Sequence, residues 1–460
     1  MSAVRTPRND REALLAQLNA SAPPHGALTH AGTRPFGNSL SVEHFRMANG
    51  LELLVCEDHS APVVAYQTWF RVGSRHEREG KTGLAHLFEH LMFNEIEGLQ
   101  AGEFDRLLEE AGAENNAATW LDWTQYTIAV PSSQLALVVK LEADRMSRLV
   151  LRDPQVASEK DVVANERRYR VEDDVEGAVS ELLWKTAYTQ HAYRWPTIGW
   201  MEDIESFTSA DCQEFYRTFY SPNNAAVVVV GDVAEADLLR LAVGAYGDMA
   251  ASVLPLEDVR PEPPQGQERR AELSKPTATE KLVIGYHGPA LGDFDHAATT
   301  LLGEVLFGGR ASRMYQKLVR TLEIASEVRV FVGPFRDPGL IEVYAAAREQ
   351  HTAEELLAAI DEELCRVKEE PVSQAEIERA LARLELGLLA SLDTADGKAS
   401  NIGFFHTVLG RPAAAFERLA AMSRTNASEL RRSARRFFVP EHRSLVMVRA
   451  DAQLVSQEAL

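Results

Sequence analysis

A stretch near the middle of the chain recurs near its end. Residues 219–234 read FYSPNNAAVVVVGDVA and residues 437–452 read FFVPEHRSLVMVRADA, so the two match at a constant offset of 218. Each copy combines two aromatic residues and a proline with an apolar run typical of a strand. Recurrence at a fixed spacing indicates that one structural unit is present twice. A chain of 460 residues is long enough for two such units, each with its own hydrophobic core.

A proline-rich, charged segment separates the two copies. It holds Pro261, Pro263 and Pro264, which remove backbone donors and favour extended conformations. We therefore predict four parts along the chain: an N-terminal arm without periodicity, a first domain, a linker and a second domain, over residues 1–40, 41–250, 251–274 and 275–460.

Local patterns predict a mixture of strands and helices in the first domain. Residues 51–58, 63–74 and 124–131 are rich in β-branched and aromatic residues, as strands are. Residues 132–149 and 155–174 carry apolar side chains at helical spacing. The predicted fold class is α+β, with two homologous units that each contain a mixed sheet flanked by helices.

Charge and hydropathy exclude several classes of protein. With 48 Lys and Arg against 68 Asp and Glu, the formal net charge of -20 repels phosphate backbones, so we expect no nucleic-acid partner. No run approaches the roughly 20 apolar residues that cross a bilayer, and the first residues lack the apolar core of a signal peptide. We expect no membrane partner and a cytoplasmic location for the chain as given, or a periplasmic one if a signal was removed. Three scattered cysteines are too few for a disulfide framework.

The motif His86-Leu-Phe-Glu89-His90 carries the strongest chemical signal. On a helix, His86 and His90 stack one turn apart with Glu89 beside them. Neutral imidazoles are good zinc ligands, and the carboxylate between them can hold a water. The order H-x-x-E-H is the inverzincin signature. The plainer alternative is a pair of hydrogen-bonded histidines on an amphipathic helix.

A catalytic zinc usually has three protein ligands, so a third must come from elsewhere. Glu159 and Glu166 lie seven residues apart on one predicted helical face. We predict Glu166 as the third ligand, and Glu159 as a carboxylate that orients a ligating histidine. Without the upstream motif, both would be interpreted as solvated surface residues.

Four segments together resemble the pitrilysin/insulinase family of zinc peptidases. They are VGSRHEREGKTGLAHLFEHLMFN, GAENNAATWLDWTQY, WPTIGWMEDIESFT and YSPNNAAVVVVGDV, which cover residues 72–94, 112–126, 195–208 and 220–233. The resemblance implies one Zn²⁺ per chain, bound by His86, His90 and Glu166. It also implies that Glu89 is the catalytic base and that Glu159 is a supporting carboxylate.

The same resemblance implies how substrate binds. Asn116, Ala117 and Thr119 match the family's edge strand, to which an extended peptide adds as a further strand. Main-chain hydrogen bonds then supply affinity with little demand on side chains. The alternative is a strand that only packs in its sheet.

The resemblance breaks down in the second half. Residues 306–330 match a family segment in which an arginine precedes a tyrosine by seven residues, and these two contact substrate and the developing oxyanion. One alignment puts Val319 and Ser326 there, and a shift by one residue puts Arg320 and Glu327 there. Either a partner chain supplies the missing groups, or this protein works without them at a reduced rate. The first alternative resembles two-subunit bacterial members and the mitochondrial processing peptidase, in which one chain carries zinc and its relative does not. We therefore expect half of a clamshell that forms a heterodimer with a homologous metal-free subunit supplying the Arg/Tyr pair, or otherwise a homodimer.

The predicted function is a zinc-dependent metalloendopeptidase that hydrolyses extended or unfolded peptides, as the active subunit of a dimer. Two alternatives remain: a non-catalytic structural or assembly subunit of the same fold, and a peptide-binding module that keeps zinc for stability.

Overall fold

The computed structural model describes residues 8–257 and 260–450. The chain forms two compact units, and neither is continuous in sequence. The first comprises residues 1–164, 197–258 and 389–416, and the second comprises residues 165–196, 259–388 and 417–460. None of the helices in the described residues combines the length and apolar character needed to cross a membrane.

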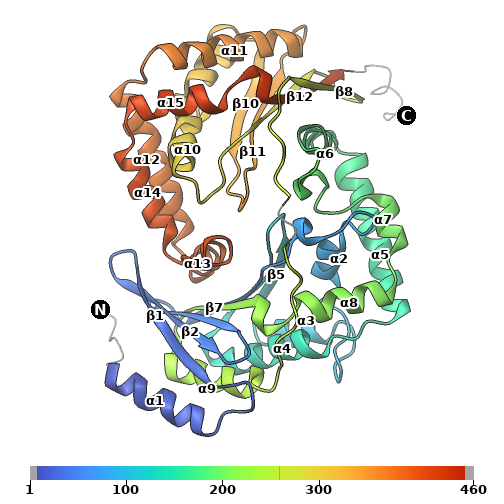
Figure 1. Cartoon of the computed structure of the whole chain (residues 1–460), viewed down its shortest axis with the longest axis vertical. Helices are drawn as coiled ribbons and strands as arrows, with labels where there is room; N and C mark the ends of the chain where they lie inside the picture. The colour runs from blue at the N-terminus through green and yellow to red at the C-terminus, as the bar shows by residue number, and fades with distance from the viewer. Residues whose placement is uncertain (1–7, 258–259, 451–460) are drawn as a thin grey trace. The chain divides into compact units, whose positions relative to one another are not determined.

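The first unit is built on a seven-stranded sheet with the order β1-β2-β3-β7-β4-β6-β5 (Figure 1). β3 and β7 run parallel, and the other neighbours pair antiparallel. The strands are β1 (Leu28–Phe36), β2 (Leu40–Met47), β3 (Glu52–Glu57), β4 (Val63–Phe70), β5 (Glu114–Thr119), β6 (Thr124–Pro131) and β7 (Ala225–Gly231).

Both faces of this sheet are covered. Alternate residues of β3 belong to different core clusters. Leu53 and Val55 belong to the larger cluster on one face, and Leu54 and Cys56 belong to a smaller cluster on the other. A strand buried on both faces is apolar throughout, which is why β7 reads AAVVVV. The helices are α1 (Arg8–Ala20), α2 (Leu84–Leu91), α3 (Glu103–Glu110), α4 (Leu135–Arg148), α5 (Asp153–Arg167), α7 (Met201–Ser206), α8 (Ser209–Phe219), α9 (Glu235–Tyr246) and α13 (Ala395–Leu409).

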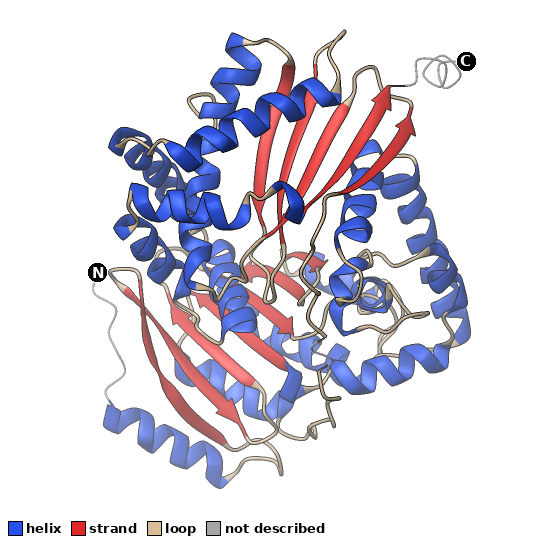
Figure 2. Cartoon of the chain, turned by 45° about the horizontal axis from the view of Figure 1, so that its top comes forward, coloured by secondary structure: helices blue, strands red, loops and turns tan. Residues whose placement is uncertain are grey.

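The second unit has a five-stranded sheet with the order β10-β11-β9-β12-β8. Figure 2 shows helices lying along this sheet. Its strands are β8 (Arg269–Lys275), β9 (Lys281–His287), β10 (Ala325–Val332), β11 (Leu340–Ala347) and β12 (Arg443–Ala450). Its helices are α6 (Val175–Ala187), α10 (Phe294–Phe307), α11 (Ala353–Glu369), α12 (Gln374–Ser391), α14 (Ala414–Arg424) and α15 (Ala427–Phe437).

The two units repeat one topology. Five strands of the first sheet, in the order β3-β7-β4-β6-β5, correspond one by one to β8-β12-β9-β11-β10. The parallel pair also recurs, since β8 and β12 run parallel as β3 and β7 do. Helix α8 and strand β7 begin at residues 209 and 225, and α15 and β12 begin at 427 and 443, an offset of 218 in both cases. The predicted pair of homologous α+β units is therefore confirmed, although the last two residues of the recurring stretch lie outside the described residues.

The units exchange equivalent helices, which a sequence repeat does not reveal. Helix α6 belongs to the first half of the chain but packs on β8, β9 and β12, whereas α13 belongs to the second half and packs on β4 and β7. The two helices begin alike: Asp174 and Thr394 each accept a hydrogen bond from a glycine amide three residues on. A Cβ on either glycine, Gly177 or Gly397, would lie 1.9 Å from a carbonyl oxygen, so both positions require glycine.

Three predicted boundaries differ from the structure. Residues 8–20 and 28–36, within the predicted irregular arm, form α1 and β1, because β1 pairs with β2 along its length. The predicted linker overlaps β8, which starts at Arg269. Because of the helix exchange, the compact units also cross the predicted contiguous domains, so residues 165–196 and 389–416 group with the opposite half.

One partly buried carboxyl in the second sheet makes stability pH-dependent. Burial raises the pKa of Glu342 from its ordinary 4.5 to about 7, although Trp184 Nε1 donates a hydrogen bond to its Oε1 at 3.2 Å. Between these two values the folded protein holds a proton that the unfolded chain has lost, so stability falls as pH rises.

We expect Glu342→Gln to remove this slope. From pH 5 to pH 8, the wild type should lose on the order of 2 kcal/mol more unfolding free energy than the variant does. Urea denaturation at both pH values measures the difference. Parallel pH profiles for the two proteins would contradict the assignment.

Candidate metal centre

Helix α2 carries the two histidines of the motif on a rigid support. Leu87, Phe88 and Leu91 are fully buried in the larger core of the first unit. Phe88 packs with its ring centroid 4.9 Å from that of Tyr220. The Phe88 carbonyl also accepts a hydrogen bond from Tyr126 Oη at 2.9 Å. The apolar side of α2 therefore faces the core, and the opposite side is left for the polar residues.

Close packing at Gly83 and hydrogen bonds to Thr82 fix the start of α2. Gly83 has a φ of +97°, and a Cβ there would lie 2.5 Å from the Ile198 carbonyl oxygen. Asp203 Oδ2 accepts hydrogen bonds from Thr82 N at 3.1 Å and from Thr82 Oγ1 at 2.6 Å. The segment WPTIGWMEDI thus positions the start of α2.

A buried carboxylate that was not predicted from the sequence caps α2. Glu77 accepts hydrogen bonds from Gly83 N at 2.8 Å and from Ala85 N at 2.7 Å. These amides are at the positive end of the helix dipole, where a carboxylate is favoured. Burial raises the pKa of Glu77, against the effect of both hydrogen bonds. The only local signal was an acidic residue shortly before the motif, which does not reveal a cap seven residues before the helix begins.

Removing this cap should destabilise the fold. Glu77→Ala leaves two buried amides without an acceptor, so we expect a loss of about 3 kcal/mol in unfolding free energy, measured with denaturant. Glu77→Gln keeps one acceptor oxygen and should lose less. The exposed control Glu109→Ala should change stability by under about 0.5 kcal/mol. Equal stability of Glu77→Ala and wild type would contradict the capping role.

The structure brings the three predicted zinc ligands together. Each of His86, His90 and Glu166 offers one donor atom, and these atoms lie within 4.8 Å of one another. The two imidazole centroids are 5.1 Å apart, as expected for residues one helical turn apart. The division between the compact units falls after Ala164, inside the continuous helix α5, and this helix extends to carry Glu166.

Glu159 lies on the same helix and reaches His90. Its Oε2 is 3.8 Å from His90 Nδ1, and its Oε1 accepts a hydrogen bond from Asn94 Nδ2 at 3.0 Å. A carboxylate held in this way can orient an imidazole through its second nitrogen. The distance exceeds a direct hydrogen bond, so the pair is in ion-pair range only.

The chain changes conformation directly after Glu166. A π-helical segment covers Arg168–Glu172, and Arg170 Nε lies 3.0 Å from Glu166 Oε1. Single π turns within helices are frequent at functional sites. The mostly exposed Arg170 therefore forms an ion pair with the Glu166 carboxylate.

Glu89 lies on α2 between the two histidines and is half-buried. Burial raises the pKa of Tyr126 and of Tyr220, and the negative charge of Glu89 adds to both shifts. Both phenols therefore stay protonated.

The predicted substrate strand is at a sheet edge. β5 pairs with β6 on one side and ends the strand order of the first sheet, and it contacts α2. Asn116 and Ala117 pair in register with Thr127 and Tyr126. The Ala117 amide donates to Asn116 Oδ1 at 2.9 Å instead of to β6, so this donor points toward the open edge. Thr119 is the last residue of β5.

The positions matched to the family's Arg/Tyr pair hold other residues in the second unit. Val319 is buried in the second core, and Ser326 follows the first residue of β10. In the shifted alignment, Arg320 is exposed at the end of a π-helical segment and Glu327 is exposed on β10. Neither alignment supplies a tyrosine.

Comparisons with known proteins show the family of this chain. Residues 53–199 match the family model described as insulinase, peptidase family M16, and residues 206–384 match the model described as peptidase M16 inactive domain. The zinc protease PqqE of Helicobacter pylori is 30% identical over 362 residues, which cover 78% of this chain and 81% of that protein. This chain belongs to the pitrilysin/insulinase family of zinc peptidases.

Solved structures of this family share the fold. The crystal structure of a protease from Helicobacter pylori superposes with a TM-score of 0.84 and 27% identity, covering 93% of this chain and all of that one. The periplasmic protease PqqL from Escherichia coli superposes with a TM-score of 0.76 at 18% identity. That match covers 93% of this chain but 49% of PqqL, so this chain corresponds to about half of the longer protein.

Proposed function

We propose that this chain is a zinc-dependent endopeptidase that cleaves extended peptides, with one zinc ion held by His86, His90 and Glu166. The convergence of these three donors within 4.8 Å, from two different helices, carries the proposal. Two imidazoles and a carboxylate are a donor set that suits zinc, and three protein ligands leave a fourth position open. Membership of a zinc-peptidase family supports the same assignment.

A zinc ion held there would supply Lewis acidity, polarising the scissile carbonyl and lowering the pKa of the attacking water. Glu89 takes a proton from that water while the oxygen of the water bonds to the carbonyl carbon. As the carbon–nitrogen bond breaks, Glu89 passes the proton to the leaving amine. Its place on α2 between the two ligands keeps the carboxylate beside the reacting atoms, while Glu159 lies in ion-pair range of the His90 ring.

The substrate adds to the edge of β5 as an additional strand. The Ala117 amide, which now bonds the Asn116 side chain, would donate to a peptide carbonyl instead. An extended peptide bound by main-chain groups lies alongside α2, because β5 and α2 are in contact. This mode favours unfolded peptides over folded proteins, since a folded substrate has few unpaired strands.

The proposal predicts about one zinc per purified chain. Chelation should abolish cleavage of an unfolded peptide, and stoichiometric zinc should restore it. The reason is that the carboxylates and imidazoles of the chain cannot act as a Lewis acid without the metal. Metal analysis and a peptide-cleavage assay on the same preparation measure both quantities. Full cleavage by a metal-free chain would refute the proposal, and a metal-free chain without turnover would support the alternative structural subunit.

We further propose that the active enzyme is a dimer in which a homologous metal-free subunit supplies an arginine and a tyrosine. This proposal is supported by the lack of the Arg/Tyr pair in either alignment, since the two positions hold Val319 and Ser326 or Arg320 and Glu327. The alignment with half of PqqL also supports it. The chain alone should cleave weakly, and co-expression with a homologue carrying the pair should raise kcat at least about tenfold. Equal activity from a monodisperse single-chain sample would argue against a partner.

A further inference from the structure

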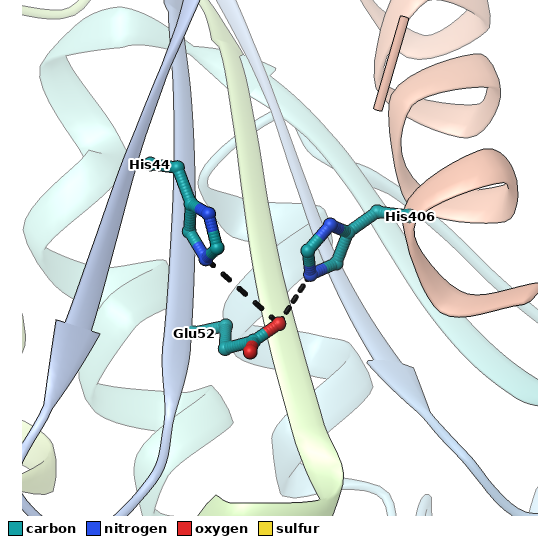
Figure 3. A group of neighbouring side chains, drawn as sticks. All are labelled: His44, Glu52 and His406. Carbon is teal, nitrogen blue, oxygen red and sulfur yellow. Dashed lines mark hydrogen bonds and ion pairs between the residues drawn. The ribbon is translucent and has the colours of Figure 1, made fainter. Parts of the chain in front are cut away.

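A second cluster of two imidazoles and a carboxylate lies in the first unit. His44 on β2, Glu52 at the start of β3 and His406 on α13 converge from three separate segments (Figure 3). One donor atom from each lies within 4.8 Å of the other two. His406 and Glu52 are buried, at 3% and 7% exposure, and His44 is partly buried.

The two histidines point at one oxygen atom. His44 Nε2 is 3.9 Å from Glu52 Oε2, and His406 Nε2 is in hydrogen-bond contact with the same oxygen (Figure 3). The rings stand almost perpendicular, with centroids 5.1 Å apart. His44 Nε2 is buried and has no hydrogen-bond partner among the residues that the structure describes. A buried nitrogen in this state requires an explanation, and an ion is one of the few that apply.

Two arginines neutralise Glu52 as the cluster stands. Arg46 Nη2 lies 2.5 Å from Oε1, and Arg71 Nη2 lies 2.7 Å from Oε2. Arg71 Nη2 is also 3.4 Å from His406 Nε2, so it contacts two of the atoms that would ligate an ion. Because a divalent cation and a guanidinium repel each other at this range, they cannot share the position. Arg71 is 28% exposed and can leave toward solvent.

We propose that His44, Glu52 and His406 form a second metal site for a zinc-type divalent transition-metal ion, which Arg71 occupies when no ion is bound. Nitrogen and carboxylate donors are what such ions prefer. Ligand atoms around a tetrahedral zinc lie roughly 3.3 Å apart, so His44 Nε2 has to approach Glu52 Oε2 by about half an ångström. Glu52 Oε1 keeps Arg46 as its partner.

The site has a structural role that follows from where its ligands come from. His406 is separated from Glu52 by 354 residues and lies on α13, the helix that the second half of the chain contributes to the first sheet. An ion shared between α13 and the β2-β3 hairpin fixes this exchanged helix to the sheet. An ion that joins residues so far apart in sequence stabilises the folded chain. This structural role does not depend on any catalytic activity of the chain.

The test uses a chain in which the α2 site is removed. In the double variant His86→Ala/His90→Ala, calorimetric titration with Zn²⁺ should still detect one ion per chain, and zinc should raise the melting temperature. Adding His44→Ala should weaken this binding at least about 100-fold. Adding His59→Ala, which removes an exposed histidine elsewhere, should leave it unchanged.

Arg71→Gln separates a metal site from an ion-pair network. If Arg71 competes with the ion, this substitution in the same background should tighten zinc binding about tenfold. An absence of saturable binding in the double variant would overturn the proposal, as would binding that His44→Ala does not change or that Arg71→Gln fails to strengthen. Because the α2 site is absent throughout, the outcome is independent of whether the chain is a peptidase.

Discussion

Replacing Glu89 by glutamine should lower kcat for peptide hydrolysis by about 1,000-fold or more, while the zinc content stays near one per chain. The amide keeps the shape of the side chain but cannot accept a proton from water, and general acid–base catalysis is worth about 100- to 10,000-fold. Glu89 is not among the three donors that converge, so the metal should remain bound. Cleavage kinetics and metal analysis of the same sample measure the two effects.

The matched control is Glu109→Gln, which removes one negative charge from the exposed face of α3. It should keep both full activity and full zinc content. Retained cleavage by Glu89→Gln would exclude this residue as the base. Loss of zinc from the same variant would instead mean that Glu89 is a ligand. A variant that binds unfolded peptides tightly without cleaving them should also be useful for trapping substrates.

Replacing Glu166 by alanine should raise the zinc dissociation constant by more than about 100-fold and abolish hydrolysis. Supporting residues around a metal typically contribute 10- to 100-fold in affinity, and the loss of a direct ligand should exceed this range. Glu159→Gln, which leaves three ligands in place, should fall within it. Competition titration against a chromophoric chelator measures the zinc dissociation constants of the wild type, Glu166→Ala and Glu159→Gln.

Glu172→Gln is the control for the Glu166 variant. This exposed carboxylate ends the π-helical segment Arg168–Glu172 and lies 3.9 Å from Arg167 Nε. It is not among the three donors that converge. Its zinc affinity should match the wild type. If Glu166→Ala and Glu159→Gln weakened zinc equally, the roles of ligand and supporting residue would have to be reassigned.

The sequence alone predicted what depends on neighbouring residues. One helical turn separates His86 from His90, so their shared face follows from helix geometry. A second helix carrying Glu159 and Glu166 was similarly predictable from spacing, and the structure brings Glu166 to the histidines. The recurring stretch predicted two related units, because a duplicated strand and its flanking helix retain their local pattern.

Tertiary structure decided what depends on residues far apart in the chain. The exchange of α6 and α13 between the units cannot be predicted from either helix alone, since both begin with the same kind of cap and differ in the strands on which they pack. Glu77 becomes a cap only because the chain folds back onto the start of α2. His44, Glu52 and His406 look unremarkable in sequence, and they meet because strand pairing and helix packing bring distant segments to one place. Helical and strand periods are local properties, whereas convergence of this kind is determined by the packing of the whole unit.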